Sequence, residues 1–450
     1  MKVRTMPTSA VVTSYEKSPS DFFSRQVYQI HSGGWSVLYR KLVRFLLLLF
    51  IFLSFPWAIP ATLLLRSLRP LFTIRLACIS STHQEAIGHF VVDMGIHWAI
   101  RQSDRSYIRY LDLYYFDPSP TLTQKVSNQF WAEMVQRNFA IYPWFLLKPL
   151  DFWNKRLPGG AIHSLAMPLI TTGSRDKYGW LEKAKTNMPF LPEEDVKAKT
   201  WLHLQGWQEG EPFVCLLVRD SAYKGTQGIQ GRVSARNSDI KNYVAAAEWL
   251  ADQGVWVIRM GKNMAKPMPT QHSHIIDYAF HPDKSNLLDL WLFAHCSLCI
   301  STGSGPDCIS DIYRRPLLIL NFSVPEQCYT WSNAMHLLKP LVWKESGTAL
   351  TLQEYLEHNW WAQGIDSDYY ARAGIQLMEL SPEEILAAVQ ECWQRILGIW
   401  VETEDDCKRQ HRFLEVLKQH PNFIKYNDWI HPQFKAGTTW LRSMGDDFLI

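Results

Sequence analysis

The chain has 450 residues, of which 47% are hydrophobic, and it carries a formal net charge of +3. A chain of this length is expected to form two or three domains, each with a core of its own. The small net charge argues against nucleic-acid binding, because a protein that follows a phosphate backbone carries a much larger basic excess. Eight cysteines are scattered along the chain, which favours a reducing compartment. Cys296 and Cys299 form one C-x-x-C pair with no second pair at zinc spacing, so we expect no metal site.

The N-terminal part contains the longest uncharged stretch. Residues 1–40 are largely polar and show no sustained period, so we expect a flexible segment. The run 45–65 is long enough to cross a bilayer, but Pro56 and Pro60 interrupt it, and basic residues flank both of its ends. We expect 41–70 to be a helical segment at the cytoplasmic face of a membrane, either peripheral, re-entrant or single-pass. A buried helix of a soluble protein is the alternative.

Alternating strand and helix patterns then predict a first α/β domain over residues 71–200. Thr73–Ser80 and Arg109–Phe116 are typical of strands, and Phe139–Phe145 is a third candidate. The loop 81–89 follows the first of these strands and precedes a helical pattern. We expect this domain to face the acceptor of a reaction.

A second α/β domain is predicted over residues 201–380. Phe213–Val218 is a continuous apolar run, as expected for a strand buried on both faces. Further strands are predicted at Val255–Met260, Ile275–Tyr278, Leu298–Ile300 and Leu317–Leu320. Strands that alternate with helices at this spacing predict a doubly wound parallel sheet, whose ligand would bind at the carboxyl ends of the strands.

The last part of the chain is predicted to be helical. Beyond Ser323 the sequence is rich in Trp and is predicted to be helical, with a helical extension over residues 381–450. Ser381–Ile399 begins with acidic residues in its first turn, and Asp406–Gln419 is a further helix. The segment Trp429–Ile450 is predicted to be mainly loop.

A loop of small residues, Ser301–Gly305, precedes Pro306, which stands where a helix begins. Such a loop can offer backbone N–H groups to an anion, usually a phosphate, although an ordinary tight βα connection is the alternative. Asp307 argues mildly against an anion, because its carboxylate would repel a nearby phosphate. Basic and polar residues also follow the other strands of this sheet. The predicted diphosphate site consists of Arg219, Asp220, Arg236, Asn237, Arg259, Gly261, Lys262, Ser301, Thr302, Gly303, Ser304 and Gly305.

Four segments of the second domain resemble a bacterial family of glycosyltransferases associated with surface-polysaccharide synthesis. These segments are Phe213–Ser221, Arg236–Tyr243, Val257–Gly261 and Ser301–Pro306. The last of them is also similar to the donor-site loop of lipopolysaccharide heptosyltransferases, although Asp307 stands where that loop usually carries a His. The resemblance implies a GT-B architecture, in which two Rossmann-like, doubly wound domains face each other across a cleft. It also implies that the C-terminal domain binds a nucleotide sugar and that no metal or cofactor is needed.

Sugar transfer requires a base for the acceptor hydroxyl and positive charge for the departing diphosphate. The first domain offers His89, Glu85 and Asp93 as candidate bases, with His83 beside them. His89 follows a glycine at a predicted helix start, where the helix dipole keeps the imidazole neutral and able to accept a proton.

The sequence thus predicts a membrane-associated glycosyltransferase of surface-polysaccharide synthesis. Its expected partners are a nucleotide-sugar donor, a glycan or lipid-linked acceptor and the membrane surface, without nucleic acid. A sugar-nucleotide epimerase of the same architecture is one alternative. A non-catalytic membrane scaffold that binds nucleotide sugars is the other.

Overall fold

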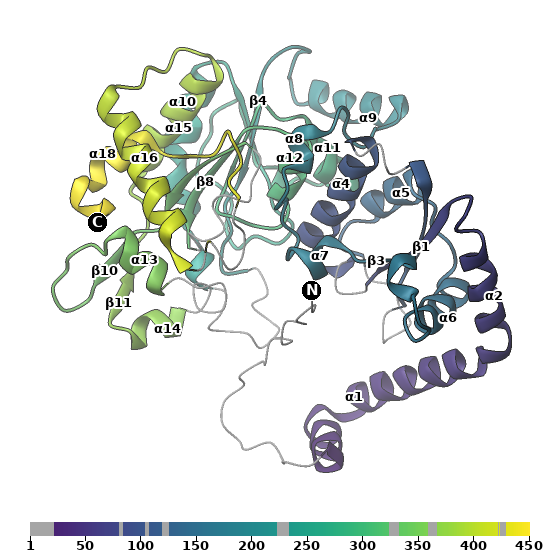
Figure 1. The fold of residues 1–450 in the computed structure, drawn as a ribbon. Helices are drawn as coiled ribbons and strands as arrows, with labels where there is room; N and C mark the ends of the chain where they lie inside the picture. The colour runs from purple at the N-terminus through teal and green to yellow at the C-terminus, as the bar shows by residue number, and fades with distance from the viewer. Residues whose placement is uncertain are drawn as a thin grey trace.

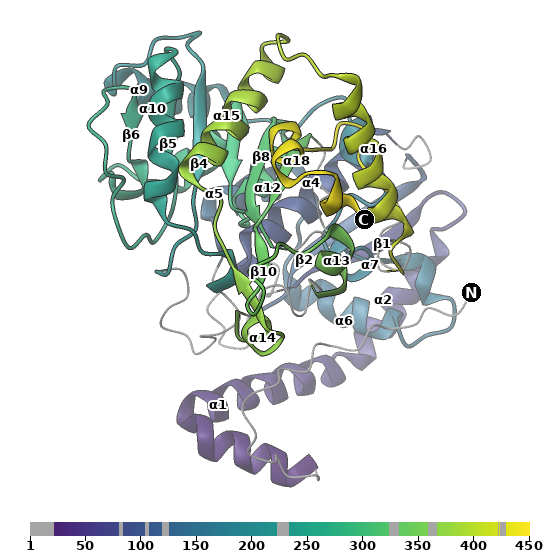
Figure 2. The ribbon, with the colours of Figure 1, turned by 90° about the vertical axis from the view of Figure 1, so that its left-hand side faces the viewer.

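The computed structural model describes residues 22–80, 84–103, 108–118, 126–222, 234–323, 333–358, 367–421, 423 and 429–450. They form a mixed α/β structure with two parallel sheets, preceded by two helices that project from its side (Figures 1 and 2). We call these two helices, residues 22–67, the arm.

The arm consists of α1 (Phe22–Leu53) and α2 (Phe55–Ser67). Residues 22–40 are therefore helical, where the sequence predicted a flexible segment; the one interruption within α1 is a kink at Gly34 (φ 58°). The break between the helices follows from Pro56, which has no N–H to donate to the preceding turn and whose ring crowds that turn. In the described part of the chain no single helix is long and apolar enough to cross a membrane. Gln26–Leu53 and α2 reach that length and composition only as a pair, which is bent by 65°.

The first unit contains a three-stranded parallel sheet in the order β2-β1-β3. Its strands are β1 (Thr73–Ile79), β2 (Tyr110–Phe116) and β3 (Ser164–Leu165). Its helices are α4 (Ile87–Ser103), α5 (Gln129–Asn138), α6 (Trp144–Asn154), α7 (Pro168–Thr171), α8 (Trp180–Lys183) and α9 (Pro192–Leu204). The strand predicted at Phe139–Phe145 is wrong. It forms only an isolated bridge between Tyr114 and Ile141, because Pro143 is followed at once by α6.

The second unit contains a seven-stranded sheet in the order β12-β9-β8-β7-β4-β5-β6, and every pair of neighbours is parallel. Its strands are β4 (Phe213–Leu217), β5 (Trp256–Arg259), β6 (Ile275–Ile276), β7 (Leu298–Ser301), β8 (Leu317–Phe322), β9 (Ala334–Leu338) and β12 (Lys435–Ala436). All residues of β4, β7 and β8 are buried, so these strands are covered on both faces as the apolar runs predicted.

Helices and a small antiparallel pair of strands complete this unit. The helices are α10 (Val244–Asp252), α11 (Asn286–His295), α12 (Asp307–Ile312), α13 (Leu352–His358), α14 (Ser367–Arg372), α15 (Pro382–Ile396), α16 (Glu404–Gln419) and α18 (Thr438–Met444). The antiparallel strands are β10 (Leu341–Trp343) and β11 (Ile375–Leu377).

The prediction that the chain beyond Ser323 is helical is therefore wrong in part. Strand β9 was missed because His336 interrupts its apolar run; in the fold this ring is buried, and its centroid lies 5.4 Å from those of Phe322 and Phe434. The C-terminal segment predicted as loop contains β12 and α18. The two residues of β12 become a strand only by pairing with β9.

The order of the large sheet reverses between β4 and β7. From β4 the chain proceeds to β5 and β6 on one side, and it then returns to β7 and β8 on the other side. In an open parallel sheet the connections leave opposite faces at such a reversal, which opens a crevice beyond the carboxyl ends of the two strands. The fold thus directs a ligand to the ends of β4 and β7.

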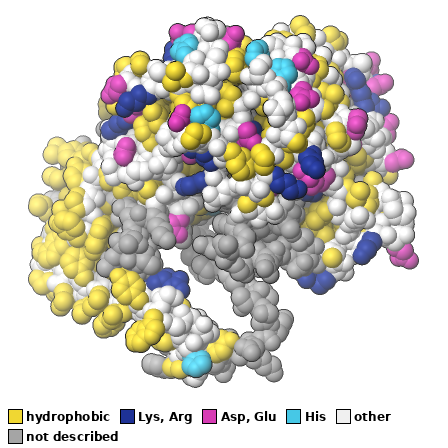
Figure 3. All heavy atoms as spheres, turned by 180° about the vertical axis from the view of Figure 1, so that it is seen from behind, with side chains coloured by type: hydrophobic (Ala, Val, Ile, Leu, Met, Phe, Trp, Pro, Cys, Tyr) yellow, Lys and Arg dark blue, Asp and Glu magenta, His cyan; other side chains and the backbone are white. Residues whose placement is uncertain are grey.

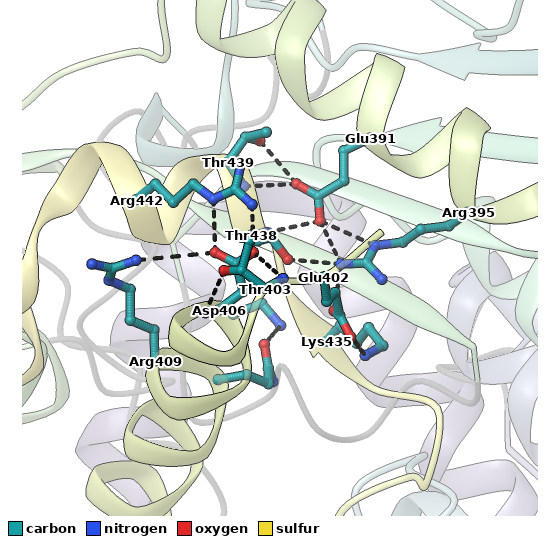
Figure 4. Close-up of polar contacts among 12 residues, drawn as sticks. Glu391, Arg395, Glu402, Thr403, Asp406, Arg409, Lys435, Thr438, Thr439 and Arg442 are labelled. Carbon is teal, nitrogen blue, oxygen red and sulfur yellow. Dashed lines mark hydrogen bonds and ion pairs between the residues drawn. The ribbon is translucent and has the colours of Figure 1, made fainter. Parts of the chain in front are cut away.

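The C-terminal helices are joined by buried ion pairs (Figure 4). Glu391 on α15 is fully buried and accepts hydrogen bonds from the amides of Thr438 (2.9 Å) and Thr439 (2.8 Å) and from Arg395 (2.9 Å). On the same side, Asp406 of α16 accepts from Nε of Arg442 at 2.7 Å. These contacts fix α18, and with it β12, against the sheet.

We predict that Glu391→Ala lowers the free energy of unfolding by about 2–6 kcal/mol, because the amides of Thr438 and Thr439 would each lose a buried acceptor at a cost of about 1–3 kcal/mol. Arg395 keeps its ion pair with Glu402 at 2.7 Å. Urea denaturation measures the change. The matched control is Glu404→Ala, since Glu404 also pairs with a cation on its own helix but is 85% exposed; it should cost about 1 kcal/mol or less. Equal losses in the two variants would contradict this account.

Candidate functional site

A cavity of about 290 Å³ lies between the two units. The first unit contributes Glu85, Ala86, Ile87, Ser127 and Asn128, and the second contributes Leu217, Arg219, Met260, Gly261, Lys262, Asn263, Met264, Asp289, Phe293, Ser304, Pro306 and Ile309. The residues of the first unit lie after β1 and just before α5. Most of those of the second unit lie at the carboxyl ends of β4, β5 and β7. We call it the first cavity, and it occupies the crevice at the reversal of the large sheet.

A second cavity of about 200 Å³ adjoins the first, and Ala86, Ile87 and Ser304 line both. Its other lining residues are Gly88, His89, Val92, Gly173, Ser174, Arg175, Asp176, Arg236, Gly303, Gly305, Cys308, Asp311 and Phe322. It is likewise bordered by both units.

Backbones of the two units approach each other closely where the cavities meet. A Cβ atom placed on Gly88 would lie 3.0 Å from Cα of Gly305, and one placed on Gly305 would lie 3.1 Å from the amide nitrogen of Gly88. Real Cβ atoms rarely come so close to another backbone, so both positions favour glycine. This contact sets the distance between the loop after β1 and the loop after β7, and hence the width of both cavities.

The loop Ser301–Gly305 is held by Asp307, which is fully buried. One oxygen of this carboxyl group accepts from the hydroxyl of Ser301 at 2.6 Å and from the amide of Ser304 at 2.7 Å. The amide of Gly303 donates to the Ser301 hydroxyl at 3.2 Å, and the amide of Thr302 donates to the carbonyl of Leu217 at 3.2 Å. The prediction that these three amides are bare and await a phosphate is therefore wrong. The Asp307 side chain, which the sequence indicated as unfavourable to an anion, itself accepts the hydrogen bond of the Ser304 amide.

The predicted cations are divided among three positions. Arg219 and Lys262 line the first cavity, and Arg236 lines the second. Arg259 lines neither cavity. Its side chain is fully buried, Nη1 lies 3.0 and 3.2 Å from the oxygens of Asp277, and its guanidinium carbon lies 5.3 Å from the ring centroid of Phe280. The structure places Arg259 in an internal ion pair, so its assignment to the diphosphate site is corrected.

Two further predicted residues stabilise loops rather than line a cavity. The carboxylate of Asp220 accepts from the amides of Ala222 (2.9 Å) and Ala265 (2.6 Å), which joins the loops after β4 and β5. The backbone carbonyl of Asn237 accepts from Lys339 at 2.7 Å. Gly261, by contrast, lines the first cavity.

Three residues that were not predicted from the sequence shape the first cavity: Asp289 and Asn128 line it, and Lys284 supports its lining. Nζ of Lys284 donates to the carbonyls of Gly261 (2.7 Å) and Lys262 (3.0 Å), which fixes the loop after β5, and burial lowers the pKa of this amine. Asp289 accepts from the hydroxyl of Tyr278 at 3.0 Å, and burial raises its pKa. Asn128 caps α5 through the amide at the third helical position. Of these three residues, only Asn128 could have been predicted from the sequence, because it stands at the N-cap position before an apolar helical pattern.

The three candidate bases lie in different surroundings. Glu85 is exposed at the rim of the first cavity. His89 lines the second cavity, its Nδ1 lies 2.9 Å from Oγ of Ser174, and burial lowers the pKa of its ring, which keeps it neutral at pH 7. Asp93 is buried and lines neither cavity; it accepts from the amide of Leu169 at 3.2 Å, and burial raises its pKa to about 7. His83 lies outside the described residues.

A short chain of hydrogen bonds connects two of these groups. Ser174, whose φ of +58° is unusual for a residue with a side chain, bonds to the carboxyl group of Asp93 and to the ring of His89. In the tautomer that suits this chain, Nδ1–H of His89 donates to Ser174 and Ser174 donates to Asp93. Nε2 then keeps its lone pair. No group of three His, Cys, Asp or Glu side chains suited to a metal ion occurs among the residues that the structure describes.

No family model matches the chain, and no curated protein sequence matches it. Among solved structures it is similar to the glycosyl transferase family 9 from Veillonella parvula, with 11% identity and a TM-score of 0.35 over 56% of this chain and 81% of that one. It is also similar to the E. coli heptosyltransferase WaaC with ADP, with 11% identity and a TM-score of 0.31 over 59% of this chain and 91% of that one. The S. aureus MnaA–UDP structure gives 10% identity and a TM-score of 0.25 over 73% and 98%. Scores this low establish no shared function.

We predict that Asp307→Asn makes the stability of the protein less dependent on pH. Burial raises the pKa of Asp307 from 3.8 to about 7, so the folded state holds a proton that the unfolded state has lost over this interval. The contribution of Asp307 to the free energy of unfolding is therefore fully present at acidic pH, and it is lost as the pH rises toward 7. An asparagine oxygen can accept the same two hydrogen bonds, but it does not titrate.

Thermal unfolding between about pH 4.5 and about pH 8 tests this prediction. The melting temperature of the wild type should fall more steeply with rising pH than that of Asp307→Asn. Asp447→Asn is the control, because Asp447 is exposed, and it should follow the wild type. Parallel curves for the wild type and Asp307→Asn would contradict a buried, titrating carboxyl group.

Proposed function

We propose that this protein is a glycosyltransferase that transfers a sugar from a nucleotide-diphosphate sugar to a glycan or lipid-linked acceptor. The observation that carries the proposal is the first cavity, which lies at the sheet reversal between two α/β units and is lined by Arg219 and Lys262. We further propose a GT-B architecture, a reaction without a bound metal, and a role in surface-polysaccharide synthesis, as the sequence resemblance implies.

The proposed donor site is the first cavity. Its volume of about 290 Å³ is close to the lower end of the range of about 300–1,000 Å³ for ligand pockets. Arg219 and Lys262 supply the positive charge that a diphosphate needs, and an arginine can bind two phosphate oxygens at once. Glu85 and Asp289 also line this cavity. Their carboxyl groups can accept hydrogen bonds from the hydroxyls of a ribose or a transferred sugar.

The proposed acceptor site is the second cavity, and His89 is the proposed base. Nε2 of the neutral ring takes the proton of an acceptor hydroxyl, while Ser174 holds the opposite ring nitrogen at 2.9 Å. The acceptor oxygen then forms a bond to the anomeric carbon of the sugar, and the bond from that carbon to the diphosphate breaks. The leaving diphosphate carries the negative charge that Arg219 and Lys262 stabilise. Asp93 acts through Ser174 as a positioning residue.

We predict that Arg219→Ala and Lys262→Ala each weaken the binding of a nucleoside diphosphate by about 1.5–3 kcal/mol, the range for a lost hydrogen bond to a charged group. Isothermal titration with UDP, ADP, GDP and CMP measures the affinities and identifies the nucleobase that the donor site prefers. Lys266→Ala is the matched control, since this lysine is 63% exposed and lines neither cavity, and it should bind as the wild type does.

Arg259→Ala separates the present assignment from the one made on sequence alone. This variant should reduce stability, because Asp277 would lose its buried partner, while the folded fraction keeps its nucleotide affinity. Unchanged affinity in both Arg219→Ala and Lys262→Ala would count against the proposed donor site.

We predict that His89→Gln lowers the rate of sugar transfer, measured as hydrolysis of the nucleotide sugar that binds most tightly, by about 10²–10⁴-fold. The affinity for the nucleoside diphosphate should not change, because His89 lies in the second cavity. His411→Gln is the control, as His411 is 77% exposed on α16. A rate that is unaffected in His89→Gln would exclude this residue as the base.

A further inference from the structure

The arm has an unusually apolar surface for a projecting element. Of the 36 large hydrophobic side chains that are exposed in the described part of the chain, 18 lie between Val27 and Leu71. Figure 3 shows hydrophobic side chains gathered over these helices, while the surface of the rest of this face is mixed. An exposed apolar surface of this kind marks a binding site for a protein or a membrane.

The apolar surface is concentrated at the bend. Residues Phe45–Leu53 contain no polar side chain. Phe45 is 61% exposed, Leu53 70% and Leu64, beyond the bend, 66%. A helix that is apolar on all sides is normally surrounded by other apolar groups. Here only one side of the helix contacts the rest of the protein, and the other side is exposed.

Contacts with α6 extend the same surface and fix the arm. The ring centroids of Phe50 and Trp144 lie 5.8 Å apart, and those of Phe55 and Trp153 lie 5.6 Å apart. Trp144 is followed by Phe145 and Leu146, which are 48% and 45% exposed. At the far end of α2, Arg66 donates to the side chain of Asn154 at 3.0 and 2.8 Å. The arm is thus attached to the first unit on one side and bare on the other.

The charges of the arm argue against a pairing of two arms. From residue 22 to 84 the sequence contains seven Arg or Lys residues and no Asp or Glu. The basic residues flank the uncharged segment 45–65, which contains the bend. Arg40, Lys41 and Arg44 precede this segment, and Arg66 and Arg69 follow it. Two copies of such a segment would repel each other, but the headgroups of anionic lipids would attract it.

The dimensions of the arm argue against a crossing of the bilayer. Phe45–Leu53 is about 13 Å long at 1.5 Å per residue, which is less than half of the hydrocarbon thickness of about 30 Å. The 65° bend then turns the chain aside, so that the basic residues on both sides of it can remain at one membrane surface.

We propose that the arm is a monotopic membrane anchor. The bend around Ser54 and the start of α6 enter one leaflet of the membrane. The flanking arginines contact anionic headgroups of that same leaflet, on the membrane face where the rest of the protein lies. A protein that uses nucleotide sugars would place this surface on the cytoplasmic leaflet. The anchor is separate from both cavities, and its test uses no nucleotide.

Flotation of the full-length protein with vesicles tests the anchor. Vesicles of phosphatidylcholine mixed with phosphatidylglycerol should bind the wild type. Phe45→Glu combined with Leu49→Glu, which lie one helical turn apart, should reduce this binding at least about tenfold, because charges replace apolar area in the leaflet. Leu204→Glu is the matched control, since Leu204 is 78% exposed on α9, and it should bind as the wild type does. Circular dichroism confirms that each variant is folded.

Two further measurements test the headgroups and the topology. Arg40→Gln, Arg44→Gln and Arg69→Gln together should reduce binding to the anionic vesicles at least about tenfold and leave weak binding to pure phosphatidylcholine unchanged. In a Cys407→Ser background, Ser36→Cys and Ser67→Cys should both react with an impermeant maleimide added outside the vesicles.

Three results would overturn the proposal. The first is a wild type that does not float with either kind of vesicle. The second is protection of one of the two introduced cysteines, which would show a segment that spans the bilayer. The third is a dimer in solution, measured by light scattering, that Phe45→Glu with Leu49→Glu dissociates, because the apolar face would then belong to a second copy.

Discussion

The arrangement of both cavities depends on one buried carboxyl group. Asp307 accepts hydrogen bonds from the side chain of Ser301 and the amide of Ser304, and so closes the loop after β7 into a fixed shape. That shape presents Gly305 to Gly88 of the first unit, where a Cβ atom on either residue would lie within 3.0–3.1 Å of the other backbone. Since the two cavities adjoin this contact, a change in the loop would change the width of both. A carboxyl group with no solvent around it is costly to ionise, and its raised pKa reflects this cost.

The same carboxyl group determines which parts of the site can bind an anion. Because the amide of Ser304 donates its hydrogen bond to Asp307, a diphosphate would be held mainly by side chains. Arg219 and Lys262 are the cations placed at the first cavity, and Lys284 supports the loop that carries Lys262 by donating to its backbone carbonyl. Arg259 lies one residue before that loop but is committed to Asp277. The proposed chemistry therefore needs two side chains from the loops after the neighbouring strands β4 and β5 and a base on the facing unit, rather than an anion-binding loop.

The central part of the fold was predictable from local patterns. The apolar runs that gave β4, β5, β7 and β8 are long and continuous, because strands buried on both faces need apolar residues at every position. Prediction failed where a strand depends on its neighbours. His336 interrupts the run of β9, and the two residues of β12 are extended only because they pair with β9. Gly34 and Pro56 were visible in the sequence, but a helix from Phe22 with a 65° bend was not.

The sequence by itself determined that the chain holds two α/β units, that polar residues follow the strands of the second, and that an apolar segment precedes both. These features depend on periodicity and on residues close together in the chain. Only the tertiary structure decided which polar residues share a cavity. Arg219 lies just after β4 and Arg259 ends the adjacent strand β5, and both have the same chemistry, yet the first lines the cavity and the second is fully buried beside Asp277. The difference lies in partners from distant parts of the chain, and strand spacing contains no information about them.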